Sequence, residues 1–164
     1  MAEGHGELIM AMMKHEQSNP RRIQHFLKVW AFTQVLCELE GVDSKTKLVA
    51  ETAAIVHDIG IKSSLAKYSS AAGKYQEAEG PPAAREMLES VGYGFDVVDR
   101  VCYLVGHHHT YENIDGLDYK ILVEADFLVN IFEGKMTSEA AQQIRETIFR
   151  TRGGKEVFDR QFGV

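Results

Sequence analysis

The sequence is poor in cysteine and proline, and it has no long apolar run. Its 164 residues include two cysteines, three prolines and one tryptophan. Two cysteines cannot build a disulfide framework, and Cys37 and Cys102 lack the paired spacing of a zinc site. Because both lie in apolar, helix-like stretches, we expect reduced core thiols in a cytoplasmic protein. No apolar run approaches the about 20 residues that span a bilayer, so we expect no membrane partner.

The chain also lacks an excess of positive charge. Its formal net charge is −6 at pH 7, so a general affinity for the backbone of a nucleic acid polymer is not expected. A local basic pocket for a small anion remains compatible with this charge. The first residues include Glu3 and Glu7 and no positively charged segment, which is not typical of a signal peptide.

Strand-like alternation is nearly absent, and helical periodicity dominates the sequence. With 45% apolar residues the chain can bury a sizeable core, and its length suits one domain over residues 1–164. We expect an all-α bundle of about seven to eight helices. The expected helices are residues 5–16, 20–40, 44–59, 81–90, 95–109, 118–132, 137–151 and 153–162. Residues 61–80 are rich in Ser, Ala, Gly and Lys, and we interpret them as a long, partly helical connection.

Four residues from three expected helices could share one metal ion. His57 and Asp58 end the apolar stretch AIVHD, where both side chains can reach a point just beyond the helix end. His25 lies within the long helix that begins at Pro20. Asp126 lies in the apolar stretch ILVEADFLVN, where a lone buried carboxylate would cost several kcal/mol unless a positive charge or a metal paired with it.

This set of two imidazoles and two carboxylates is suited to a divalent Mn, Fe, Ni, Co or Zn ion. Each residue also has a simpler interpretation. His57 and Asp58 could form a stabilising pair at a helix end, His25 could be a hydrogen-bonded core histidine, and Asp126 could be a capping or salt-bridged residue.

The order of these residues resembles the HD superfamily of metal-dependent phosphohydrolases. RRIQHFLKVW is similar to the family's first histidine segment, AAIVHDIG to its signature doublet, and ILVEADFLVN to its closing aspartate helix. The resemblance covers most of the chain, from about residue 22 to residue 130. It implies an all-helical fold and hydrolysis of a phosphate ester of a nucleotide or another small phosphorylated metabolite.

Some members of the superfamily hold a second metal, and the resemblance suggests candidates for it here. These are Glu79, near a position where such members place a histidine, and His107 and His108, near their histidine pair. We interpret His109 as a bystander. For catalysis, Glu79 and His107 are the candidates for activating water or protonating the leaving group.

Cationic side chains near the expected metal would hold a phosphate group. The candidates are Lys62 and Lys74 in the irregular connection and Arg22 one helical turn before His25, whereas we interpret Arg21 as surface charge. Two alternatives to a phosphohydrolase remain open. One is an HD-type di-iron oxygenase, and the other is a non-catalytic metal-dependent sensor or interaction module. Substrate identity, the metal and the oligomeric state are not determined by the sequence.

Overall fold

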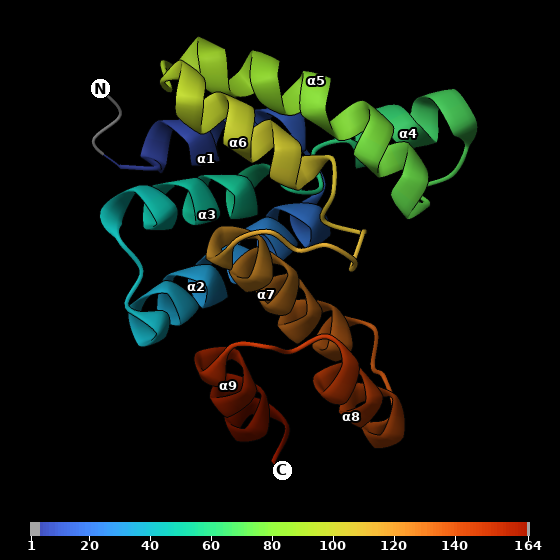
Figure 1. Ribbon diagram of the computed structural model, residues 1–164. Coiled ribbons are helices and arrows are strands. Elements are labelled where there is room, and N and C mark those ends of the chain that lie inside the picture. Colours follow the sequence, from blue (N-terminus) through green and yellow to red (C-terminus); the bar gives the residue numbers. More distant parts are fainter. Residues whose placement is uncertain (1–3, 164) are drawn as a thin grey trace.

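A computed structural model of the protein describes residues 4–163, and over this range the structure is all-α (Figure 1). The described range contains nine helices, against the seven to eight expected. They are α1 (Gly6–His15), α2 (Pro20–Glu40), α3 (Ser44–Val56), α4 (Ile61–Tyr68), α5 (Gly73–Val91), α6 (Phe95–Val105), α7 (Leu117–Glu133), α8 (Ser138–Thr147) and α9 (Arg152–Phe162). None of these helices is both long enough and apolar enough to cross a membrane.

The boundaries of α2 and α3 follow from local signals in the sequence. The side chain of Asn19 accepts a hydrogen bond of 3.1 Å from Arg22 N, and Pro20 occupies the first helical position of α2. Gly41 ends α2 in the left-handed region, with a φ of 62°. Asp43 then caps α3 by accepting a hydrogen bond of 2.9 Å from Thr46 N.

The segment 61–80 departs from expectation, because it forms α4 and the first part of α5. Helix α5 continues through Pro81 and Pro82, where a new helix was expected to begin. Tertiary contact accounts for this. The turn at Gly60 packs so closely on α5 that an added Cβ at Gly60 would lie 2.6 Å from the backbone nitrogen of Gly80. That docking holds the segment before the prolines in helical form, against the local preference of proline for a helix start.

Helices α2, α3 and α7 meet at the centre of the molecule (Figure 1). Helix α2 packs on α3 and α7, and α3 also packs on α6 and α7. The pair α5 and α6 covers one end of this centre, while α8 and α9 lie at the other end, beyond α7. The residues with the four predicted ligand side chains lie on α2, α7 and the turn after α3. The packing therefore brings segments far apart in sequence to one place.

Candidate metal centre

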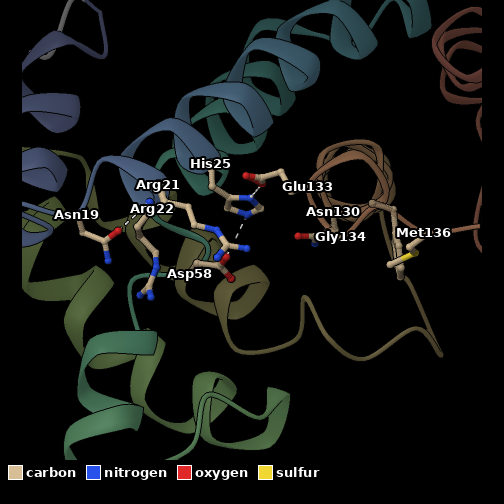
Figure 2. A pocket seen from close by; sticks show the side chains of 10 residues that line it. Asn19, Arg21, Arg22, His25, Asp58, Asn130, Glu133, Gly134 and Met136 are labelled. Carbon is tan, nitrogen blue, oxygen red and sulfur yellow. Dashed lines mark hydrogen bonds and ion pairs between the residues drawn. The ribbon is translucent and has the colours of Figure 1, made fainter.

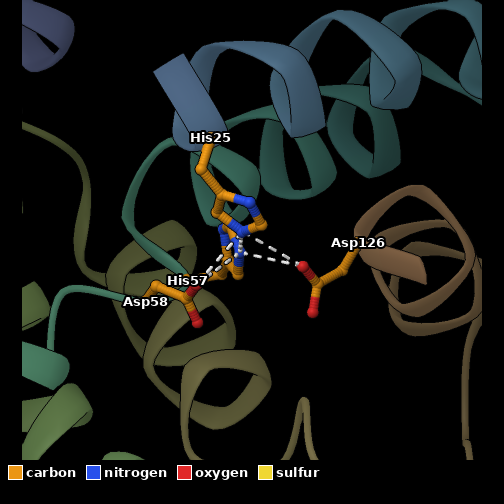
Figure 3. A group of neighbouring side chains, drawn as sticks. All are labelled: His25, His57, Asp58 and Asp126. Atoms are coloured by element: carbon orange, nitrogen blue, oxygen red, sulfur yellow. Dashed lines mark hydrogen bonds and ion pairs between the residues drawn. The ribbon is translucent and has the colours of Figure 1, made fainter. Parts of the chain in front are cut away.

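The four predicted ligands form one compact, buried group (Figure 3). One ligand atom from each of His25, His57, Asp58 and Asp126 lies within 4.8 Å of the others. His25 Nε2 is 3.1 Å from Asp58 Oδ2 and 3.3 Å from Asp126 Oδ1. His57 Nε2 is 3.3 Å from each of the same two oxygens. All four residues are at most 8% exposed, so the group is largely shielded from water.

The end of α3 fixes the orientation of His57. Its Nδ1 is 2.7 Å from the carbonyl oxygen of Ala54. A carbonyl oxygen can only accept, so Nδ1 carries a proton, and Nε2 is the nitrogen that faces the cluster. Holding one ring nitrogen this way while the other faces the site is the usual arrangement of a metal-binding histidine.

When both histidines are neutral, the four groups direct only acceptor atoms at one another, and such a set fits a cation. The Nε2 atoms of His25 and His57 lie 3.2 Å apart and face the carboxylates of Asp58 and Asp126. Among the described residues, Asp58 and Asp126 have no ion pair with a lysine or arginine. Asn130 donates a hydrogen bond of 2.9 Å to Asp126 Oδ1, which does not neutralise its charge. Such a buried set needs a cation, and its nitrogen and oxygen atoms suit a divalent metal ion.

Without a metal ion, protons supply the positive charge of this group. Burial alone would lower the pKa of His25, but its hydrogen bonds to Asp126 and Asp58 outweigh burial and raise the pKa to about 9. Burial likewise opposes the charge on His57, yet the nearby carboxylates raise its pKa well above the usual value. Burial favours protonation of Asp58, but the charge of His57 and hydrogen bonds from the histidines hold the pKa of that carboxyl well below its usual range.

A second group of possible ligands lies directly beside the first and shares Asp58 with it. One ligand atom each from Asp58, His108 and His109 falls within 4.8 Å of the others. His108 Nδ1 donates to the carbonyl oxygen of Val105 at 2.8 Å, and its Nε2 lies 3.1 Å from Asp58 Oδ1. Asp58 therefore presents Oδ2 to the first group and Oδ1 to the second.

The second group differs from the predicted set of Glu79, His107 and His108, of which only His108 belongs to it. Helix α6 ends at Val105, so the three histidines lie in a turn, where His107 packs against Tyr103 with its ring centroid 4.1 Å away. His107 Nδ1 donates to the carbonyl oxygen of Tyr103 at 2.7 Å.

His109, expected to be a bystander, instead faces the cluster side and contacts Gln76 Oε1 at 3.0 Å. The carboxylate of Glu79 turns toward α4, where Lys67 Nζ lies 2.8 Å away and Tyr68 also donates to it. Because α5 begins at Gly73, it presents Gln76, one turn before Glu79, to the ring of His109. No sequence signal marked Gln76, since its role depends on where α5 begins.

A cavity of about 690 Å³ opens onto His25 and Asp58 (Figure 2). The start of α2 and the end of α7 form its two sides. Its lining residues are Asn19, Arg21, Arg22, His25, Asp58, Phe127, Asn130, Glu133, Gly134 and Met136. The cavity therefore has cationic side chains on the α2 side and mixed polar and apolar side chains on the α7 side.

Of the three predicted phosphate-binding residues, only Arg22 lines this cavity. Arg21, which the sequence had suggested to be surface charge, also lines it. Lys62 instead donates to the carbonyl oxygen of His15 at 2.9 Å, and Lys74 Nζ lies over the Tyr75 ring, 4.8 Å from its centroid. The sequence signal for Arg21 was its place beside Arg22, one turn before His25. In the structure both side chains of this first turn of α2 line the cavity.

Comparison with known proteins places these observations in a family. The model of the HD domain family matches residues 22–149. The chain belongs to the HD domain family. The match includes all four residues of the first group and both histidines of the second. The resemblance drawn from the sequence is thereby confirmed.

The fold of this HD domain protein is also found in a solved structure. A crystal structure of a predicted HD superfamily hydrolase from an uncultured Thermotogales bacterium superposes with a TM-score of 0.69 at 20% sequence identity. The match covers 97% of this chain and 86% of that chain. At this identity the likeness confirms the predicted all-α fold. A comparison with curated proteins gave no match.

Proposed function

We propose that this HD domain protein is a metal-dependent phosphohydrolase that acts on a phosphate ester of a nucleotide or another small phosphorylated metabolite. The observation that carries the proposal is the convergence of four buried side chains, two of which, His25 and Asp58, line a cavity that also has two arginines. The description of the structural relative as a predicted hydrolase is consistent with this assignment.

The residues present fit a divalent metal ion, and His25, His57, Asp58 and Asp126 would hold it. When bound, such an ion lowers the pKa of a coordinated water and neutralises charge on a phosphoryl oxygen. The burial of the four side chains strengthens their electrostatic interactions, because the local dielectric constant is lower than that of water.

Arginine side chains supply the proposed contacts to the phosphate group. Arg21 is exposed and has no ion pair among the described residues, and Arg22 has only a long contact of 3.9 Å to Glu16. Both guanidinium groups are therefore available to a ligand in the cavity, and their planar donors suit phosphate oxygens. On the opposite side, Phe127, Asn130 and Met136 offer apolar and hydrogen-bonding contacts to the organic part of a substrate.

One observation keeps oxygen chemistry as a second candidate function. The second group, Asp58, His108 and His109, lies next to the first and shares a carboxylate with it, as two adjacent metal ions would require. Two irons per chain and oxygen consumption would support an HD-type oxygenase instead of a phosphohydrolase.

The test begins with protein stripped of metal by a chelator and reloaded with Mn²⁺, Co²⁺, Ni²⁺, Fe²⁺ or Zn²⁺. Phosphate release is measured with p-nitrophenyl phosphate, bis(p-nitrophenyl) phosphate and a panel of nucleoside monophosphates. We expect metal-dependent release that Asp126→Asn abolishes and that Arg22→Ala weakens mainly through KM. Arg152→Ala, on α9 away from the cavity, is the matched control and should leave the rate unchanged. Metal binding without phosphate release from any ester would contradict the proposal.

A further inference from the structure

The ring of His25 is held differently from those of the other two histidines whose Nε2 atoms face Asp58. His57 and His108 donate from Nδ1 to the backbone carbonyls of Ala54 and Val105. His25 Nδ1 instead lies 2.5 Å from Glu133 Oε1, a side-chain carboxylate 108 positions away in sequence. One ligand of the first group thus depends on a single replaceable side chain.

The position of His25 within its helix explains why a side chain is needed. His57 is the C-cap of α3, and His108 follows the end of α6, so carbonyl oxygens of the last helical turn are free to accept from their rings. His25 lies inside α2, where each nearby carbonyl accepts a hydrogen bond of the helix itself. The acceptor for His25 Nδ1 must therefore come from another element, and α7 provides it.

The location of Glu133 is unfavourable for a carboxylate, apart from these contacts. It is the last residue of α7, where the partial negative charge of the helix end repels an acidic side chain by about 0.3–1 kcal/mol. The contact with His25 and a hydrogen bond of 3.2 Å from Lys28 Nζ offset this cost. Lys28 lies on α2 one turn after His25, so Glu133 contacts two α2 side chains together.

We propose that Glu133 is a positioning residue for the metal site: it holds His25 with the proton on Nδ1 and with Nε2 toward Asp58 and Asp126. This inference rests on the proposed function to the extent that the first group binds a divalent ion. Loss of Glu133 leaves the His25 ring free to turn about its χ2 bond or to carry its proton on Nε2, and both changes remove a ligand atom. Lys28 supports this arrangement by fixing the second oxygen of the same carboxylate.

The experiment measures the dissociation constant of Mn²⁺ by titration calorimetry on the chelator-stripped full chain. Glu133→Ala should weaken Mn²⁺ binding by roughly 10- to 100-fold, as is usual when the partner of a metal-binding histidine is lost. Glu133→Gln should weaken it less than the alanine variant, because the amide oxygen still accepts from Nδ1. Lys28→Met, which leaves the contact between His25 and Glu133 in place, should change it least.

A second readout and a structural control separate positioning from general stability. Long-range ¹⁵N NMR of the histidine rings should show His25 protonated at Nδ1 in the Zn²⁺-bound wild type and a changed ring signature in Glu133→Ala. Glu124→Gln alters another buried carboxylate of α7 that contacts no histidine, so it should lower the melting temperature without changing the Mn²⁺ affinity.

Three results would overturn the inference, and they differ in what else they affect. If Glu133→Ala binds Mn²⁺ within twofold of wild type, Glu133 does not position His25, and the proposed function stands. If the wild type binds none of the five divalent ions, both this inference and the proposed function fail. Equal loss of affinity in Glu124→Gln and Glu133→Ala would also reject a specific role.

Discussion

Replacing Gly60 by alanine should destabilise the protein by pushing the turn that carries His57 and Asp58 away from α5. A Cβ at Gly60 would lie 2.6 Å from Gly80 N and 2.8 Å from Gln76 O. Both atoms belong to the backbone of α5, so no side-chain rotation can relieve the clash. The two segments would have to separate, and the buried contact between them would be lost.

The expected size of the effect follows from comparison with Gly80. A Cβ at Gly80 would clash with a side-chain atom, Val105 Cγ1 at 2.6 Å, while the nearest backbone atom, Gly60 N, lies 4.0 Å away. Overpacking of this kind typically costs about 1–3 kcal/mol, so we expect Gly80→Ala to fall in that range and Gly60→Ala to exceed about 3 kcal/mol. For a domain of this size, 3 kcal/mol corresponds to a fall in melting temperature of roughly 6–12 °C.

Urea unfolding of the metal-free protein, followed by circular dichroism, measures both changes. Gly6→Ala is the matched control, because a Cβ there meets nothing within 4 Å, and it should stay within about 0.5 kcal/mol of wild type. A Gly60→Ala variant as stable as wild type, or more stable than Gly80→Ala, would refute the argument from backbone contact.

Three further predictions concern stability, pH and anion binding. Glu124→Gln should lower the free energy of unfolding by about 1–3 kcal/mol in urea titrations, because the Glu124 carboxylate accepts hydrogen bonds from Arg150 N and Thr151 N that join α7 to the start of α9. Mn²⁺ affinity should rise as the pH increases toward 9, because the pKa of His25 is raised to about 9 and a metal must displace its proton. Calorimetry in buffers of different ionisation enthalpy should detect the proton release, and a pH-independent affinity would contradict the prediction. The double variant Arg21→Ala, Arg22→Ala should weaken binding of inorganic phosphate to the metal-loaded protein at low salt at least tenfold, and an unchanged affinity measured by competition would exclude both arginines as phosphate ligands.

The parts of the molecule that could be predicted from sequence are those set by local chemistry. Asn19 and Pro20 mark the start of α2, and the structure begins the helix there. The need of Asp126 for a partner could also be predicted, because a carboxylate in an apolar helix is costly to bury alone. The resemblance to the HD superfamily then indicated His25, His57 and Asp58 as its neighbours.

The parts that sequence did not predict depend on contacts between distant segments. The helical form of residues 73–80 depends on the approach of Gly60 to Gly80, which no local pattern reveals. The presence of His109 in the second group, in place of the predicted His107, has a similar cause. The turn after α6 is held by Glu77, which accepts from His109 N at 3.0 Å and from Thr110 Oγ1 at 2.9 Å. This long-range contact decides that His108 and His109, and not His107, join Asp58 in the second group.

The divided carboxylate of Asp58 has a thermodynamic consequence. If cations bind at both groups, a cation at the first would draw electron density from the shared carboxylate and would repel a cation at the second. Occupancy of one group would then alter the affinity of the other, and by linkage the two changes in binding free energy would be equal. Two bound ions per chain would therefore appear as two unequal steps in a titration, and a substitution of Asp58 would change both steps.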